Sequence, residues 1–262
     1  MSVAVVAAAF YLLASWLVMR RLRARREARA GAWLLTAVCA VALHGLFHAL
    51  AWRTDGGVDL HFFSALSLTG LGMAALTTLY AAAGRMGALG VVVFPVAALT
   101  LLGAALMPGT AARVLDWRLD LHAWLALLAY ATLAIAALLA IMLWAQERAL
   151  RRREFHGWLQ LLPPLTELET LLFRTIWTGF VLLTATLLTG VLFVHDFFAQ
   201  HLIHKSVLSL LSWLVFGALL LGRWRYGWRG TKAVRLTLVA MALLILAFFG
   251  SKFVLELVLQ RA

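Results

Sequence analysis

The sequence predicts an all-α fold, a polytopic membrane helix bundle with about eight transmembrane helices. Of the 262 residues, 64% are hydrophobic and 13% are charged, and the mean hydropathy is +0.94. Soluble domains average about 25% charged residues, so this composition is typical of a membrane protein. There is no linker-like or low-complexity segment. We therefore expect a single integral membrane domain over residues 1–262.

Eight apolar runs have the length of about 20 residues that a helix needs to cross a hydrocarbon core of about 30 Å. The first run has no basic residue before it and several after it, the reverse of a cleavable signal peptide, which predicts an anchor helix with its N-terminus outside. Pro95 lies in the fourth run, where neighbouring helices can satisfy the freed carbonyl. The runs are 2–19, 31–52, 60–82, 86–107, 121–145, 172–194, 206–222 and 233–258.

The fifth run has the clearest polarity. His122 stands one step inside it, uncharged residues follow over 123–146, and the basic triplet Arg151, Arg152 and Arg153 closes the segment. Basic residues favour the cytoplasmic side of a membrane helix. The pattern therefore predicts that His122 lies near the opposite, extracytoplasmic surface.

The distribution of cations predicts the same topology for the whole chain. With the N-terminus outside, 17 of the 23 Lys and Arg residues fall in the inner connections. This bias favours an N-out/C-out, multi-pass protein of a bacterial inner (plasma) membrane. The net charge of +12 also fits nucleic-acid binding. Because the cations stand in short clusters between apolar runs, we expect membrane lipid and no nucleic acid as the partner.

Known catalytic motifs are missing from the sequence. Cys39 is the single cysteine, so C-x-x-C redox chemistry, cysteine-bound zinc and covalent haem attachment are excluded. The motifs H-E-x-x-H, G-x-S-x-G, the P-loop and the Gly-rich dinucleotide fingerprint are absent. We expect a protein that is not an enzyme.

The eight histidines fall unevenly on the predicted topology. Seven lie on the outer side, and only His156 lies inside. Histidine is the commonest metal ligand and a frequent axial ligand of haem. The alternative is that each histidine is simply a hydrogen-bonded residue at the membrane boundary. Both interpretations, ligand and boundary residue, stay open. The outer histidines are His44, His48, His61, His122, His195, His201 and His204.

The sequence predicts a helix cap and a tight turn on the inner side, and a belt of tryptophans at the ends of the apolar runs. Thr166 and Glu169 have the spacing of an N-terminal capping box, and residues 227–230 (GWRG) predict a tight turn among basic residues that suit lipid phosphates. Eight tryptophans near the run ends are expected to be interfacial belt residues. They are Trp16, Trp33, Trp52, Trp117, Trp124, Trp144, Trp177 and Trp224.

Five stretches together resemble the cytochrome c assembly protein family of haem-handling membrane proteins, in its small CcsA-like/HemX-like branch (YpjD type). The resemblance covers most of the chain from about residue 40 onward. Taken singly, each stretch is an ordinary apolar helix, and their combination is what is specific. They are residues 61–70, 121–140, 162–193, 204–235 and 248–256.

The resemblance implies a noncovalent haem b site at the outer face. In the wider family, outer histidines are axial haem ligands and a Trp-rich loop presents haem to an apocytochrome. By resemblance, His122 corresponds to the first outer histidine, His204 is its expected partner, and His44 is a third candidate. The Trp-rich loop is missing here, and HDFFAQHLIHK (195–205) stands in its place.

Two functions of different class follow from these observations. The first is a haem-binding protein related to cytochrome c biogenesis, with haem as its ligand and other cytochrome c assembly or membrane proteins as possible partners. The second is a HemX-like regulatory or accessory membrane subunit that binds no haem. An optical spectrum of the purified protein separates the two.

Overall fold

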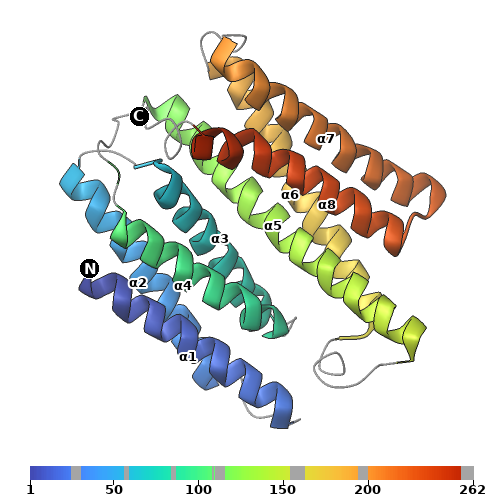
Figure 1. Ribbon diagram of the computed structural model, residues 1–262, viewed down its shortest axis with the longest axis horizontal. Coiled ribbons are helices and arrows are strands. Elements are labelled where there is room, and N and C mark those ends of the chain that lie inside the picture. The colour runs from blue at the N-terminus through green and yellow to red at the C-terminus, as the bar shows by residue number, and fades with distance from the viewer. Residues whose placement is uncertain are drawn as a thin grey trace. The chain divides into compact units, whose positions relative to one another are not determined.

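The structure is a computed structural model that describes residues 1–24, 31–55, 59–83, 87–107, 109, 116–153, 163–193 and 200–254 (backbone alone for 54–55 and 200–203). Its contacts divide the chain into two compact units, Met1–Leu115 and Asp116–Ala262, which are described separately. Every regular element in the described residues is helical (Figure 1). The single domain expected from the sequence stays a prediction.

Unit 1 is a bundle of four long helices. They are α1 (Ser2–Ala24), α2 (Gly31–Asp55), α3 (Phe62–Ala82) and α4 (Gly90–Leu106), with a short 3-10 turn, η1 (Gly87–Leu89), before α4. Consecutive helices pack on each other, and α1 also packs on α4, which closes the ring. Pro95 lies inside α4, as the sequence predicts.

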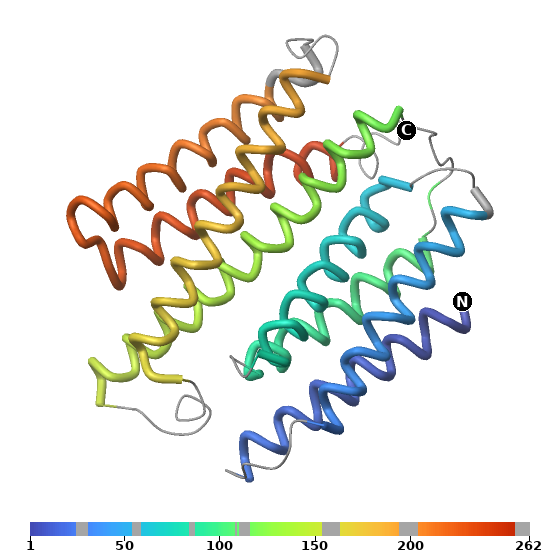
Figure 2. Tube along the Cα trace, turned by 180° about the vertical axis from the view of Figure 1, so that it is seen from behind, coloured from blue at the N-terminus to red at the C-terminus, as the bar shows by residue number. Residues whose placement is uncertain are grey.

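Unit 2 is also a bundle of four helices, and three of them are longer than any helix of unit 1. It contains α5 (Trp117–Arg152), α6 (Leu165–Phe193), α7 (Gln200–Tyr226) and α8 (Thr231–Ile245), which continues as the π-helical segment η3 (Leu246–Gly250). Helix α5 packs on both α6 and α8, and α7 packs on α6 and α8 (Figure 2). The α5–α6 pair approaches closely at Gly179, where a Cβ would lie 2.5 Å from Leu133 Cδ2. Small residues permit such close contacts between membrane helices.

The eight predicted spans are confirmed, because eight helices of the described residues are long and apolar enough to cross a membrane. The chain is thus an all-α, multi-pass membrane protein. Two helix ends on the predicted inner side differ from the expected ones. Helix α5 runs on to Arg152, and α6 begins at Leu165 instead of 172. The N-out/C-out orientation stays a prediction.

Glu169 explains why α6 begins early. Its carboxylate is 5% exposed and accepts hydrogen bonds from Arg223 Nη1 at 2.8 Å and from Arg229 Nε and Nη2 at 3.1 and 3.0 Å. The capping box expected at Thr166 and Glu169 is therefore wrong: Thr166 lies inside α6, and Glu169 bonds to α7 and to the turn before α8. Two arginines offset the cost of burying this carboxylate.

The same ion pairs shape the predicted turn at residues 227–230. Gly227 and Gly230 have φ of 64° and 54°, a conformation that glycine adopts without strain. The hydrogen bond and the charge of Glu169 raise the pKa of Arg229 above its ordinary value. Arginine is protonated at any physiological pH, and the ion pair of Arg229 with Glu169 holds the turn against α6.

A hydrogen-bonded polar chain crosses the core of unit 1. The Tyr11 hydroxyl lies 3.1 Å from His44 Nδ1, and the Nε2 atoms of His44 and His48 each lie 2.9 Å from Ser67 Oγ. His44 and Ser67 are fully buried, and the two imidazole rings stack with centroids 5.4 Å apart. Unpaired polar groups are costly inside a membrane bundle, so this chain ties α1, α2 and α3 together.

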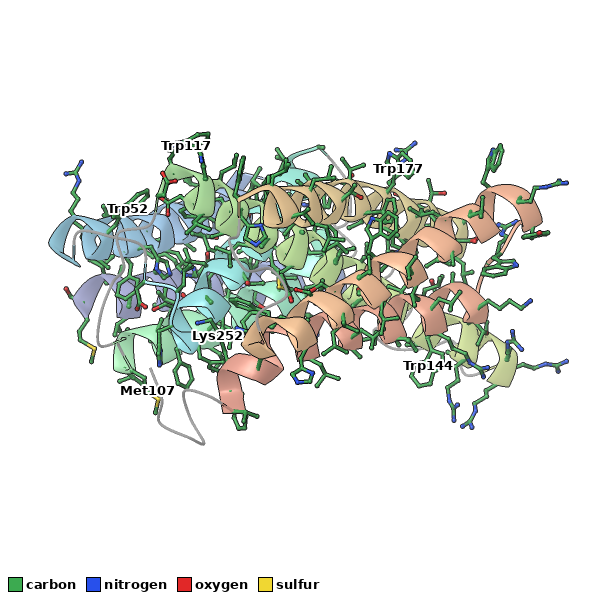
Figure 3. The ribbon with its side chains drawn as sticks, turned by 90° about the horizontal axis from the view of Figure 1, so that it is seen from above. Trp52, Met107, Trp117, Trp144, Trp177 and Lys252 are labelled. Carbon is green, nitrogen blue, oxygen red and sulfur yellow. The ribbon has the colours of Figure 1, made fainter. Side chains whose placement is uncertain are left out.

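The tryptophans divide into two groups. Seven of the eight expected belt residues are exposed; in Figure 3, Trp117 and Trp144 lie toward opposite ends of α5, and Trp177 projects from α6. Trp33 is the exception, with only 5% of its surface exposed. The belt interpretation of Trp33 is therefore wrong, and its indole belongs to the interior of unit 1.

Glu169→Gln should lower the apparent Tm in detergent by roughly 4–8 °C, which corresponds to about 2 kcal/mol in a chain of this size. The neutral amide leaves two arginines without their counter-charge. Circular-dichroism melting measures the change. The matched control is Glu167→Gln, an exposed carboxylate on the same helix, which should shift the Tm less. Equal shifts for the two variants would contradict the structural role of Glu169.

In unit 1, Ser67→Ala should destabilise the protein more than Tyr11→Phe, because the first leaves two imidazole nitrogens unpaired and the second leaves one. We expect about 1 kcal/mol for each lost hydrogen bond. Tyr80→Phe is the control, since Tyr80 makes no hydrogen bond through its hydroxyl within the described residues. The order of the three midpoints in thermal or denaturant unfolding tests the polar chain; a reversed order would show that it does not stabilise unit 1.

Candidate functional site

Unit 2 encloses a cavity of about 230 Å³ among α5, α6, α7 and the end of α8. Its walls are mostly apolar, with Leu183 of α6, Leu244 of α8 and Phe248 of η3 among them. A few polar side chains also face it. These are His122, Tyr130, Thr186, Lys205, Ser206 and Ser209. An apolar cavity with a few converging polar groups is the usual form of a small-molecule site.

The position of His122 is set by the start of α5. Asp116 precedes the helix in an extended conformation, and Asp120 lies in its first turn, where a negative charge favours the helix N-terminus. His122 follows in the second turn and is partly buried against α6. The imidazole thus stands at one end of the bundle, on the wall of the cavity.

Thr189 is the side-chain hydrogen-bond partner of His122. Nδ1 lies 3.1 Å from Thr189 Oγ1, and the same hydroxyl lies 2.9 and 3.0 Å from the carbonyls of Ala185 and Thr186. When the Thr189 hydroxyl donates its one proton to either carbonyl, its oxygen accepts from Nδ1–H. In this neutral tautomer, Nε2 carries a lone pair, and no described residue donates a hydrogen bond to it. An Nδ1–H held in this way is the usual support of a histidine that binds a metal through Nε2.

His204, the expected partner of His122, lies in the first turns of α7 and is exposed. Its neighbours Lys205 and Ser206 line the cavity, and His204 does not. The structure thus brings His122 and the start of α7 together around one cavity, but it records no contact between the two histidines.

His44, the third candidate, belongs to the polar chain of unit 1. Both of its ring nitrogens lie at hydrogen-bond distance from side-chain oxygens, of Tyr11 and of Ser67. An iron ligand needs a free lone pair, so His44 would have to give up one of these bonds to bind haem. Its neighbour His48 shares Ser67 with it.

The other histidines add no further ligand set. The side chains of His156, His195 and His201 lie outside the described residues. The backbone N–H of His61 donates to Asp59 Oδ1 at 2.8 Å. Within the described part of the chain, no three His, Cys, Asp or Glu side chains are grouped so that they could hold a metal ion.

Sequence reasoning missed the π-helical wall of the cavity. The Tyr130 hydroxyl donates to the Leu244 carbonyl at 2.5 Å, just before α8 changes to the π-helical segment that supplies Ala247 and Phe248. Such segments interrupt the ordinary hydrogen-bond ladder and often occur at functional sites. Periodicity does not reveal a change of this kind. The available signal was Tyr130 itself, a polar group within an apolar run that needs an acceptor.

Comparison with known proteins gives a family model and individual relatives that agree with each other. A family model described as "Cytochrome C assembly protein" matches residues 29–259. The Inner membrane protein YpjD of Escherichia coli (strain K12) is 33% identical over 236 residues, which cover 87% of this chain and 89% of that protein.

Two further relatives cover less of the chain. A "28.8 kDa protein in nifR3-like 5'region" of Azospirillum brasilense is 38% identical over 143 residues, or 54% of this chain and 53% of that protein. A Cytochrome c biogenesis protein CcsA of Prochlorococcus marinus is 28% identical over 89 residues, or 33% of this chain and 28% of that protein. No solved structure matches significantly. The match over most of the length, together with eight apolar helices, shows that the chain is an inner-membrane protein that belongs to the cytochrome c assembly protein family.

Proposed function

We propose that this protein binds one haem b noncovalently in the cavity of unit 2, with His122 Nε2 as an axial ligand. The observation that carries the proposal is the state of His122. Its Nδ1 lies 3.1 Å from Thr189 Oγ1, which can hold an Nδ1–H, and no described residue donates a hydrogen bond to Nε2 beside the apolar cavity. Kinship with a protein named for cytochrome c biogenesis supports the same ligand class.

The residues around the cavity fit the chemistry of haem. Leu183, Leu244 and Phe248 offer an apolar surface to a macrocycle, and the ammonium group of Lys205 suits a propionate carboxylate. The cavity of about 230 Å³ is smaller than the roughly 300–1,000 Å³ of typical ligand pockets. A macrocycle would therefore enter partly and leave one edge beyond the cavity mouth.

The remaining ligand assignments are also proposals. His204 could become the second axial ligand if the first turn of α7 rotated it toward the cavity, where its neighbours already lie. His44 would require a separate haem position in unit 1. When bound, haem would supply an iron centre as cargo or as a permanent group. We propose a binding and handling role, with no catalytic step and with other cytochrome c assembly or membrane proteins as partners.

The first test is an optical spectrum of His122→Gly. Protein expressed with haem supply and purified in detergent should show a Soret band, and the variant should lose most of it, because the pocket keeps its shape but loses its iron ligand. Free imidazole should restore the band by entering the space that the side chain left. His204→Ala and His44→Ala, measured alongside, report whether either residue supplies the second ligand.

A wild-type protein without a Soret band, or a His122→Gly variant with an unchanged one, would contradict the proposal. The first result would favour the HemX-like accessory subunit that binds no haem. Cross-linking in membranes should then recover a stable protein partner.

The support from Thr189 gives a second test. Thr189→Val removes the oxygen that holds Nδ1–H and should weaken haem binding about tenfold, the lower end of the usual effect of such supporting groups. Thr189→Ser keeps the hydroxyl and should bind as the wild type does. Thr178→Val is the matched control on the same helix, since Thr178 is exposed and bonds only the Arg174 carbonyl of its own helix. A haem titration gives each affinity, and equal losses in the two valine variants would argue against the role of Thr189.

A further inference from the structure

A second cavity, of about 240 Å³, lies at the end of unit 1 where α1 and α3 finish and α2 and η1 begin. Along α1 and α3, this cavity is separated from the polar chain of Tyr11 and Ser67. It shares no lining residue with the proposed haem site. Val18, Arg21 and Leu22 line it from one face of α1, because residues three and four apart lie together on a helix. The Lys and Arg bias assigns this end of the unit to the cytoplasmic side of the membrane.

Trp33 forms another wall of this cavity and carries an unsatisfied donor. Trp33 is 5% exposed, and its Nε1–H has no hydrogen-bond partner among the described residues. The ring edge next to Nε1 faces η1, since a Cβ on Gly87, which also lines the cavity, would lie 3.4 Å from Cζ2 and Cη2 of Trp33. An indole can only donate, so this buried Nε1–H calls for an acceptor that the described residues do not supply.

Arg21 gives this cavity a positive charge. It is partly exposed, it lines the same cavity, and no carboxylate pairs with it among the residues that the structure describes. The remaining walls are apolar, including Val18, Leu22 and Ala81. A guanidinium and an indole N–H beside an apolar hollow match a phosphate oxygen group joined to an apolar body.

From these observations we infer that the cavity lined by Arg21 and Trp33 binds a phosphate-bearing anion, with the phosphodiester headgroup of an anionic lipid as its source. Basic pockets between membrane helices on the cytoplasmic side are known to take such headgroups. Arg21 would bind the phosphate oxygens, and Trp33 Nε1–H would donate to one of them. The neighbouring acyl chain would lie along the apolar walls.

The test uses the full-length protein, delipidated in a neutral detergent and titrated with phosphatidylglycerol, with phosphatidylcholine and with inorganic phosphate. Native mass spectrometry counts the bound lipid, and melting measures the gain in Tm. Phosphatidylglycerol should bind and raise the Tm more than phosphatidylcholine does. Arg21→Gln should weaken this binding about tenfold, since a charge-assisted hydrogen bond is lost, and Trp33→Phe should weaken it by a smaller factor.

Two neighbours provide matched controls. Arg23 is exposed and does not line the cavity, and Trp16 is 55% exposed on the same helix. Arg23→Gln and Trp16→Phe should leave binding within about twofold of the wild type. If Arg21→Gln unfolds the protein, Gly87→Val gives a second route, because its side chain would enter the cavity beside Trp33 and should abolish binding.

Each outcome bears on the inference. Inorganic phosphate that competes with phosphatidylglycerol would support the anion site and identify free phosphate as an alternative source. Equal losses in Arg21→Gln and Arg23→Gln would overturn it, because the effect would then belong to the basic helix end in general. Equal binding of phosphatidylcholine, or binding that survives Gly87→Val, would overturn it as well.

Discussion

The structure depends on one constraint of the membrane interior, which is that polar groups must find their partners within the protein. Each unit meets it in its own way. In unit 1, Tyr11, His44, His48 and Ser67 share hydrogen bonds across three helices. In unit 2, one buried carboxylate, Glu169, joins α6 to α7 and to the turn before α8. These polar contacts determine which helix faces turn inward. Apolar side chains do not, because contact with lipid and contact with another helix are equally favourable for them.

The same constraint explains how much of the fold the sequence predicts. Run length depends on the thickness of the membrane alone, so the sequence predicts the eight spans correctly. The ends were predicted less well, because α6 begins at Leu165 where Glu169 meets two arginines that lie 54 and 60 residues further along the chain. Partners so distant in sequence leave no local pattern. The burial of Trp33 has the same origin: a tryptophan near a run end resembles every other belt residue until a helix packs over it.

For the candidate site, the sequence predicts the residue type and the side of the membrane, and the side stays a prediction. The resemblance ranks His122 first, His204 as its partner and His44 third, but the sequence cannot give the hydrogen bonds of their ring nitrogens. The structure distinguishes them by what their nitrogens contact and by whether they face a cavity. His44 has both nitrogens engaged, His204 is exposed, and His122 lines the cavity of unit 2. The spacing of His44 and His48 predicted a shared helix face, and Ser67 on another helix is what turns that face into a polar chain.

The contrast between His44 and His122 also separates stabilisation from binding. A histidine that only ties helices together gains most when both nitrogens are bonded, as in unit 1. A histidine that receives a ligand must keep one nitrogen free and hold the ring by the other. His122 fits the second case, because no described residue donates a hydrogen bond to its Nε2, and the apolar cavity that it lines provides the space for a ligand.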